Sequence, residues 1–200
     1  MGKDIAVISY NLNPGSSLTA DAVVFRDTLN GAGYSAKLVH QWSINEPNAS
    51  YFKSEKDWER YDGIVICGFY GAWNLRELIR SGRPVICANV GYVDDLGLGE
   101  VIQEHISEDD FTVANNTHPI TTGYSLGSLD IGNPVWVDSI ATNNHLVEIL
   151  ITTLSNSAVL VVHKTHPLVY FGWYRMSQTS ESSPLFDFLL KSAKWAFSGP

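Results

Sequence analysis

The sequence is short of basic residues and has no long apolar run, and each shortage excludes a class of protein. Its 13 Lys and Arg stand against 21 Asp and Glu, giving a formal net charge of −8 over 200 residues. Because nucleic-acid binding draws on clustered cations that displace phosphate counterions, we expect no nucleic-acid partner. No apolar stretch approaches the roughly 20 residues of a membrane span, so we expect no membrane partner either.

A signal-peptide pattern is also missing from the N-terminus. The opening stretch "MGKDIAVISY" enters an apolar run almost at once, without the charged, apolar and small-residue order of a secretory leader. We therefore expect a cytoplasmic protein, or one that is incorporated in a larger assembly.

Cysteine is scarce: Cys67 and Cys87 end two similar apolar runs, "IVIC" and "PVIC". Two buried free thiols are a commoner outcome than a disulfide for such a pair, and two Cys alone make a poor zinc site. The six histidines contain no His-Glu-x-x-His pattern, and only His163 and His166 are close in sequence, across a turn. We predict neither a metal nor another cofactor.

What the first half does contain is an alternation of apolar runs with amphipathic segments. Leu18, Ala22, Phe25 and Leu29 recur at helical spacing before a stop at Gly31. Helices are predicted at 18–31, 52–62 and 75–79, and strands at 4–10, 35–42, 63–69 and 84–89. Strands that alternate with helices in this way indicate a parallel sheet.

The second half has apolar runs separated by turn residues rather than by helices, at 111–115, 134–140, 146–154, 157–164 and 167–174. They predict an antiparallel extension, with a hairpin at "HKTHP". Ser183 as N-cap and Pro184 at the first helical position begin a final amphipathic helix.

The sequence thus predicts one α/β domain over 1–200. We expect a flavodoxin-like three-layer sandwich: a mostly parallel sheet with helices on both faces and an antiparallel extension in the C-terminal half.

Three stretches carry a resemblance to a known family: "YDGIVICG" at the third strand, "NNTHPITTGYSLG" in the middle, and the ending "YFGW...SPLFDFLLKSAKWAFSG". Together they resemble the class I glutamine amidotransferase-like superfamily, particularly its trehalose-utilisation-like branch. The resemblance implies an active site at the carboxyl ends of the strands. It also implies a nucleophilic Cys on the elbow after the fourth strand and a His with a carboxylate beyond a late strand.

The sequence departs from that pattern at both catalytic positions. "PVICANVG" places Asn89 at the elbow, with Gly91 two residues later, and an amide is no nucleophile. Cys87 lies two residues earlier and should point down into the packing. After the late strand the chain reads "GWYRM" instead of a His-Pro-Glu pattern, and His166 precedes that strand. We therefore predict a degenerate site, which favours a chain without the family's catalytic activity and leaves its status as an enzyme open.

Aromatic residues are expected to gather around this elbow. Beside Asn89, the predicted crest consists of Tyr70, Trp73, Tyr92, Trp173 and Tyr174, which follow the third, fourth and last strands. Tyr and Trp are enriched at interfaces, so the crest is interpreted as a surface for a protein partner or a glycan. The alternative is that these rings cover the core. The predicted function is a binding or structural module, such as an accessory component of a virion, and homo-oligomers are compatible with it.

Two other functions stay open. A hydrolase or isomerase could use relocated residues on the same crest, namely Asp94, Asp95 or His118, although the two aspartates equally suit a helix start and His118 a structural loop. A flavodoxin-like cofactor binder could use the 11–19 loop, where Asn11, Ser16 and Ser17 would hold an anion. Ordinary helix capping is the alternative for that loop.

Overall fold

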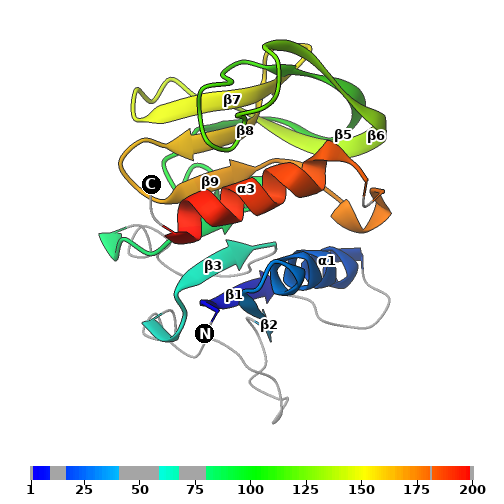
Figure 1. Ribbon diagram of the computed structural model, residues 1–200. Helices are drawn as coiled ribbons and strands as arrows, with labels where there is room; N and C mark the ends of the chain where they lie inside the picture. Colours follow the sequence, from blue (N-terminus) through cyan, green and yellow to red (C-terminus); the bar gives the residue numbers. More distant parts are fainter. Residues whose placement is uncertain (1, 10–16, 41–58, 68–79, 181, 199–200) are drawn as a thin grey trace.

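The computed structural model describes residues 2–9, 17–40, 59–67, 80–180 and 182–198 (Figure 1). The strands are β1 (Asp4–Ser9), β2 (Ser35–His40), β3 (Gly63–Ile66), β4 (Val85–Cys87), β5 (Glu100–Val113), β6 (Gly127–Ala141), β7 (Val147–Thr153), β8 (Ala158–His163), β9 (Leu168–Phe171) and β10 (Trp173–Tyr174). The α-helices are α1 (Ser17–Gly31) and α3 (Pro184–Ser198), and short 3-10 turns are η2 (Val90–Tyr92) and η3 (Met176–Gln178).

All these strands belong to one sheet with the order β10-β6-β5-β7-β8-β9-β4-β3-β1-β2. The strands β9, β4, β3, β1 and β2 pair in parallel. The pairing of β8 with β9 and all pairings among β8, β7, β5, β6 and β10 are antiparallel. A further pairing of Ile140 on β6 with Ala158 on β8 closes β6, β5, β7 and β8 into a barrel. A closed sheet has no free edge there, which protects the longest strands from pairing with other chains.

The predicted flavodoxin-like sandwich is therefore wrong. The sheet is mostly antiparallel, and a closed barrel stands where an antiparallel extension of a mostly parallel sheet was predicted. The main cause is β5, which begins at Glu100 and runs 14 residues alongside the 15-residue β6. Its first part, "EVIQEHISEDD", is largely charged and polar, so an apolar-run criterion finds only its end at Phe111.

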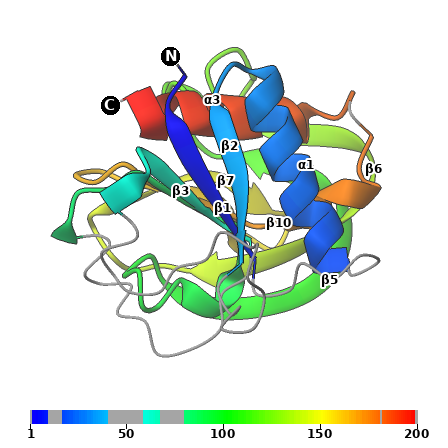
Figure 2. The ribbon, with the colours of Figure 1, turned by 90° about the horizontal axis from the view of Figure 1, so that it is seen from below.

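The expected covering of both sheet faces by helices is also wrong for the described residues. Both α1 and α3 lie on one side of the sheet in two perpendicular views (Figures 1 and 2). Residues of both helices share a core cluster with Val7, Val65 and Ile86. The opposite face, with Ile8, Ile64, Ile66 and others, packs against the segment around η2 through Val90, Val93, Leu96 and Leu98.

The two predicted terminal helices and four early strands are confirmed. In α1, Ala22, Phe25 and Leu29 are buried as the spacing predicted. At the start of α3, the Leu185 N–H donates to Ser183 Oγ (3.4 Å), which makes Ser183 the N-cap, and Pro184 is the first helical residue. The "HKTHP" turn does join the antiparallel pair β8 and β9.

The predicted helix around 75–79 and residues 52–58 of the one predicted at 52–62 lie outside the described residues. Within the described ones, no helix combines the length and the apolar character needed to cross a membrane.

Candidate functional site at the β4 elbow

The carboxyl ends of the parallel strands meet at one edge of the sheet, and the chain leaves β4 there through Ala88 and Asn89. Asn89 has an extended backbone (φ −138°, ψ 120°) and serves as N-cap of η2. Its Oδ1 accepts a hydrogen bond from the Gly91 N–H (2.9 Å), and its Nδ2 donates to the Cys67 carbonyl at the end of β3 (3.4 Å). Asn89 therefore ties two neighbouring strand ends together.

These two bonds decide what the elbow can do chemically. Backbone N–H groups at such a turn are suited to stabilise an oxyanion that develops during acyl transfer. Here the Gly91 N–H already donates to the side chain of Asn89. A carboxamide supplies neither a nucleophile nor a base at neutral pH, so the described elbow offers no acyl-transfer chemistry at Asn89.

Neither cysteine replaces the missing nucleophile. Burial raises the pKa of the Cys87 thiol to about 12, and its Sγ donates to the Asn89 carbonyl (3.1 Å). Burial, with the nearby Asp21 and Cys87, raises the pKa of Cys67 well above its usual value. Both thiols are buried and free, as predicted, and they lie in core clusters on opposite faces of the sheet. They stay protonated and therefore unreactive near neutral pH.

Behind the elbow, two segments far apart in sequence are joined by a buried carboxylate. Asp21 Oδ1 on α1 accepts hydrogen bonds from the Ser177 N–H (3.0 Å) and the Ser177 Oγ (2.6 Å) on η3. The cavity beside it has a volume of about 10 Å³, which is room for no more than one water. It is lined by Asp21, Phe25, Cys67, Ala88, Trp173, Arg175 and Met176. In the described part of the chain, this part of the elbow is filled.

Arg175 connects the elbow to the barrel surface. Its backbone is left-handed (φ 59°, ψ 47°), an uncommon conformation for a residue with a side chain. Its guanidinium carbon lies 5.3 Å from the ring centroid of Trp136 on β6, a cation–π geometry. Trp136 is 37% exposed. We call Trp136 and Arg175 the Trp–Arg pair.

Sequence reasoning missed Asp21 and the Trp–Arg pair, although each carried some signal. Asp21 precedes Ala22 and lies four residues before Phe25, so it is a carboxylate on the buried face of a helix. Trp136 stands between the buried Val135 and Val137 and therefore faces outward. Nothing in the sequence indicates the left-handed backbone of Arg175.

Trp173, one residue of the predicted aromatic crest, lies in the core and not at the surface. Trp173 is 1% exposed and packs edge-to-face on Phe111 and Phe171 and parallel to Phe188, so it covers the core. Tyr92 is half-buried in η2 and packs against the core on the opposite face. Tyr174 belongs to β10, paired with Trp136. Tyr70 and Trp73 lie outside the described residues, as do Asn11 and Ser16 of the predicted anion loop, while Ser17 begins α1.

The residues of the relocated-enzyme hypothesis do not come together. Asp94 and Asp95 are exposed in the turn after η2, close to the elbow. His118 packs on Trp195 near the end of α3 (ring centroids 5.2 Å) and accepts from the Ile120 N–H through Nδ1 (3.2 Å). That end of α3 reaches the opposite edge of the sheet, because a Cβ added to Gly63, the first residue of β3, would meet the ring of Phe197.

Burial lowers the pKa of two histidines. Burial lowers the pKa of His118, and Glu148 partly opposes this. Burial and the neighbouring His166 lower the pKa of His163, whose ring lies 4.8 Å from that of His166. Within the described residues, no three His, Cys, Asp or Glu side chains are grouped so that they could hold a metal ion.

No protein-family model matches the chain, and no curated protein matches it in sequence. Solved structures do match it in fold. A ThuA-like protein from Parabacteroides merdae ATCC 43184 aligns with a TM-score of 0.69 at 12% identity, over 100% of this chain and 91% of that one. A ThuA-like protein from Bacteroides uniformis ATCC 8492 aligns with a TM-score of 0.65 at 13% identity, over 98% and 91%. A glutamine amidotransferase from Thermotoga maritima aligns with a TM-score of 0.62 at 11% identity, over 100% of both chains. The chain therefore has a ThuA-like, glutamine amidotransferase-like fold, and at these identities the likeness extends to the fold alone.

Proposed function

We propose that this chain is a non-catalytic module of amidotransferase-like fold that acts in binding or assembly. The observation that supports the proposal is Asn89, which stands at the elbow after β4 with both ends of its amide engaged, to the Gly91 N–H and the Cys67 carbonyl. Since the two thiols nearby are buried and protonated, the described elbow has no activated nucleophile.

The surface that suits recognition best is the Trp–Arg pair beside the elbow. Trp and Arg are the residue types most enriched among the side chains that dominate binding energy at protein interfaces. Trp136 presents apolar area, and Arg175 lies over its ring, so the two are already held in a defined arrangement. A rigid aromatic anchor loses little conformational freedom on binding, which favours affinity. We propose a protein partner for this surface.

The non-catalytic part is tested by assaying the purified protein for ammonia release from glutamine and for hydrolysis of ester and amide substrates. We expect rates at the level of the blank, both for the unchanged chain and for Asn89→Ala. Turnover that disappears in Asn89→Ala would show that the elbow is catalytic and would overturn this part.

The binding part is tested by cross-linking in the native host and comparing the partners recovered with Trp136→Ala and with Leu154→Ala. Both side chains are large, apolar and exposed, at 37% and 65%, but Leu154 lies in the turn between β7 and β8. We expect a specific protein to be recovered with the unchanged chain and Leu154→Ala and lost with Trp136→Ala. Equal recovery with both variants would exclude the Trp–Arg pair as the binding surface.

A further inference from the structure

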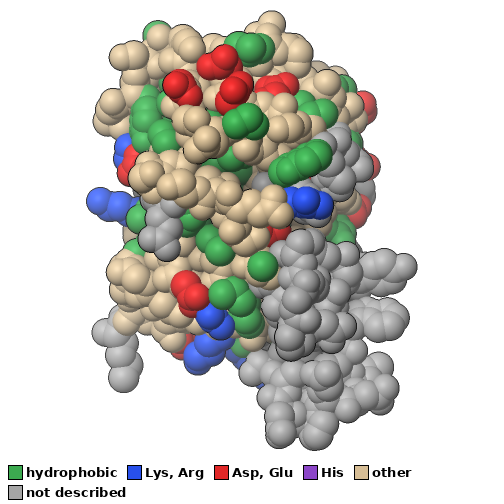
Figure 3. Space-filling view, turned by 90° about the vertical axis from the view of Figure 1, so that its right-hand side faces the viewer, with side chains coloured by type: hydrophobic (Ala, Val, Ile, Leu, Met, Phe, Trp, Pro, Cys, Tyr) green, Lys and Arg blue, Asp and Glu red, His purple; other side chains and the backbone are tan. Residues whose placement is uncertain are grey.

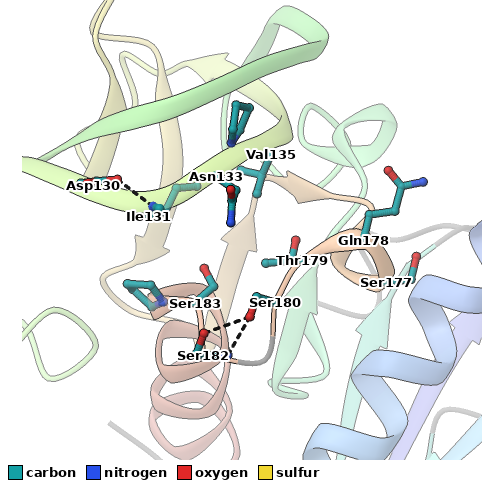
Figure 4. A pocket seen from close by; sticks show the side chains of 13 residues that line it. Asp130, Ile131, Asn133, Val135, Ser177, Gln178, Thr179, Ser180, Ser182 and Ser183 are labelled. Carbon is teal, nitrogen blue, oxygen red and sulfur yellow. Dashed lines mark hydrogen bonds between the residues drawn. The ribbon is translucent and has the colours of Figure 1, made fainter.

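A second, larger hollow lies between the barrel strand β6 and the segment that leads into α3. Its volume is about 650 Å³, within the range typical of small-molecule sites. The close-up shows Asn133 on the β6 side and Thr179, Ser180 and Ser183 on the other side of the same space (Figure 4). Ser177, whose N–H donates to Asp21, also lines this hollow, whereas Asn89 does not.

The wall on the β6 side is built by an irregularity in the strand pairing. Asp130 pairs with Asp110 and Val135 with Glu108, so residues 131–134 of β6 face a single residue of β5. Gly132 adopts a positive φ of 88°, and its N–H donates to Asp130 Oδ1 (2.7 Å). Such bulges re-aim side chains and are over-represented at the rims of barrels and next to active sites. This bulge takes Asn133 and Pro134 out of the residue-by-residue pairing between β5 and β6.

The opposite wall is a short run of hydroxyl side chains that hold one another in place. Ser180 Oγ and Ser182 Oγ are 2.9 Å apart, and the Ser183 N–H donates to the Ser180 carbonyl (2.9 Å). The side chains of Ser180 and Ser182 are exposed and keep further hydrogen-bonding capacity toward solvent, because each hydroxyl has one donor and two acceptor sites.

The chemistry of the lining disfavours an anionic ligand. Its described polar members are Asp130, Asn133, Ser177, Gln178, Thr179, Ser180, Ser182 and Ser183, and they include no Lys or Arg. The carboxylate of Asp130, the one carboxylate among these described members, already accepts a hydrogen bond from the Gly132 N–H. Acidic side chains also gather on the upper, barrel part of this side of the molecule (Figure 3). A phosphate or carboxylate ligand would therefore meet repulsion, and none of the described lining residues supplies a cation to pair with it.

Apolar side chains also line the hollow, and a purely polar ligand would make no use of them. Ile131 and Val135 are buried at its base, and Pro134 and Pro184 lie at its sides. Hydroxyl and amide groups around an apolar base match a molecule that has hydroxyls along its edge and C–H groups on its face. We propose that this hollow binds a neutral, polyhydroxylated ligand of the short-glycan class. The site is separate from the elbow and does not depend on the function proposed there.

The test is a titration of the isotope-labelled full chain, followed by amide NMR shifts, with maltotriose, cellotriose, xylotriose and N,N′,N″-triacetylchitotriose. We expect at least one of them to shift the amides of Gly132, Asn133 and Ser180 saturably at about 10 mM, as a Kd near 1 mM requires. Inorganic phosphate under the same conditions should leave these amides unshifted.

Two variants in the lining and one outside it make the result specific. Asn133→Ala and Thr179→Ala should each weaken binding about tenfold, the loss expected when one hydrogen bond to the ligand is removed and its partner is left unsatisfied. Ser128→Ala, an exposed serine elsewhere on β6, should leave the affinity unchanged. The proposal is overturned if no trisaccharide shifts these amides, if phosphate shifts them as strongly, or if the lining variants bind as well as Ser128→Ala.

Discussion

At the scale of single residues, the side chains at the elbow are unreactive. Asn89 is an amide, and the thiols of Cys67 and Cys87 are kept protonated by burial. Asn89 could be placed at the elbow from the sequence, because the strand and the turn after it have a recognisable pattern. Its hydrogen bonds to Gly91 and Cys67 could not be, since they depend on how β3 and β4 align. The same holds for Asp21, whose partner Ser177 lies 156 residues away.

The buried thiols lead to a prediction about stability at high pH. The usual thiol pKa is 9.0, and burial raises that of Cys87 to about 12. The unfolded chain therefore releases this proton first, and the stability that the protonated thiol contributes is complete below pH 9 and is lost as pH rises toward 12. We expect the free energy of unfolding to fall by about 1 kcal/mol between pH 8 and pH 10 because of this one group.

The measurement is urea unfolding at the two pH values for the unchanged chain and for Cys87→Ala. Cys67 and the tyrosines whose pKa is raised contribute to both chains, so the difference between their slopes isolates Cys87. A pH dependence that is identical in the two chains would contradict the assignment.

At the scale of elements, the sequence predicts what is set by local pattern and fails where distant segments decide. Ala22, Phe25 and Leu29 mark α1 by spacing alone, and Ser183 with Pro184 marks the start of α3. The first part of β5 is charged and becomes a strand only because β6 pairs with it. The closing contact between Ile140 and Ala158 has no local signature at all, which is why the barrel was missed.

The packing of α3 on the sheet makes a prediction about one glycine. A Cβ at Gly63 would lie 2.5 Å from Cδ1 of Phe197 and 3.1 Å from the side chain of Ile5, closer than van der Waals contact allows. We expect Gly63→Ala to destabilise the fold by about 1–3 kcal/mol, the usual cost of overpacking a core. The measurement is the urea midpoint of unfolding.

Two further variants separate overpacking from an effect of alanine itself. A Cβ at Gly31 would meet nothing within 4 Å, so Gly31→Ala is the matched control and should change stability little. Replacing Phe197 by Leu in the Gly63→Ala chain should recover part of the loss, because the smaller side chain can shift. If Gly31→Ala costs as much as Gly63→Ala, the contact with Phe197 is not the cause.

At the scale of the whole molecule, α3 joins the barrel to the parallel section of the sheet. Near its start, Asp187 accepts a hydrogen bond from Tyr124 Oη (2.8 Å) and pairs with Lys191 (2.8 Å), which also donates to the Thr122 carbonyl (2.9 Å). At its end, Phe197 packs on Gly63, and its carbonyl accepts from Lys3 Nζ. One helix thus contacts the loop before β6 and the first strands of the chain.

This connection predicts that the two sections unfold together. β1 and β8 are each paired on both sides and almost wholly buried, so their central amides should open only when the sheet itself opens. Because α3 packs on both sections, we expect Val7 and Val161 to exchange with the same free energy, equal to that of global unfolding. Native-state hydrogen exchange in rising urea measures this directly. Exchange at Val7 with a smaller free energy and a weaker urea dependence would mean that the parallel section opens first, and that the packing of α3 does not couple it to the barrel.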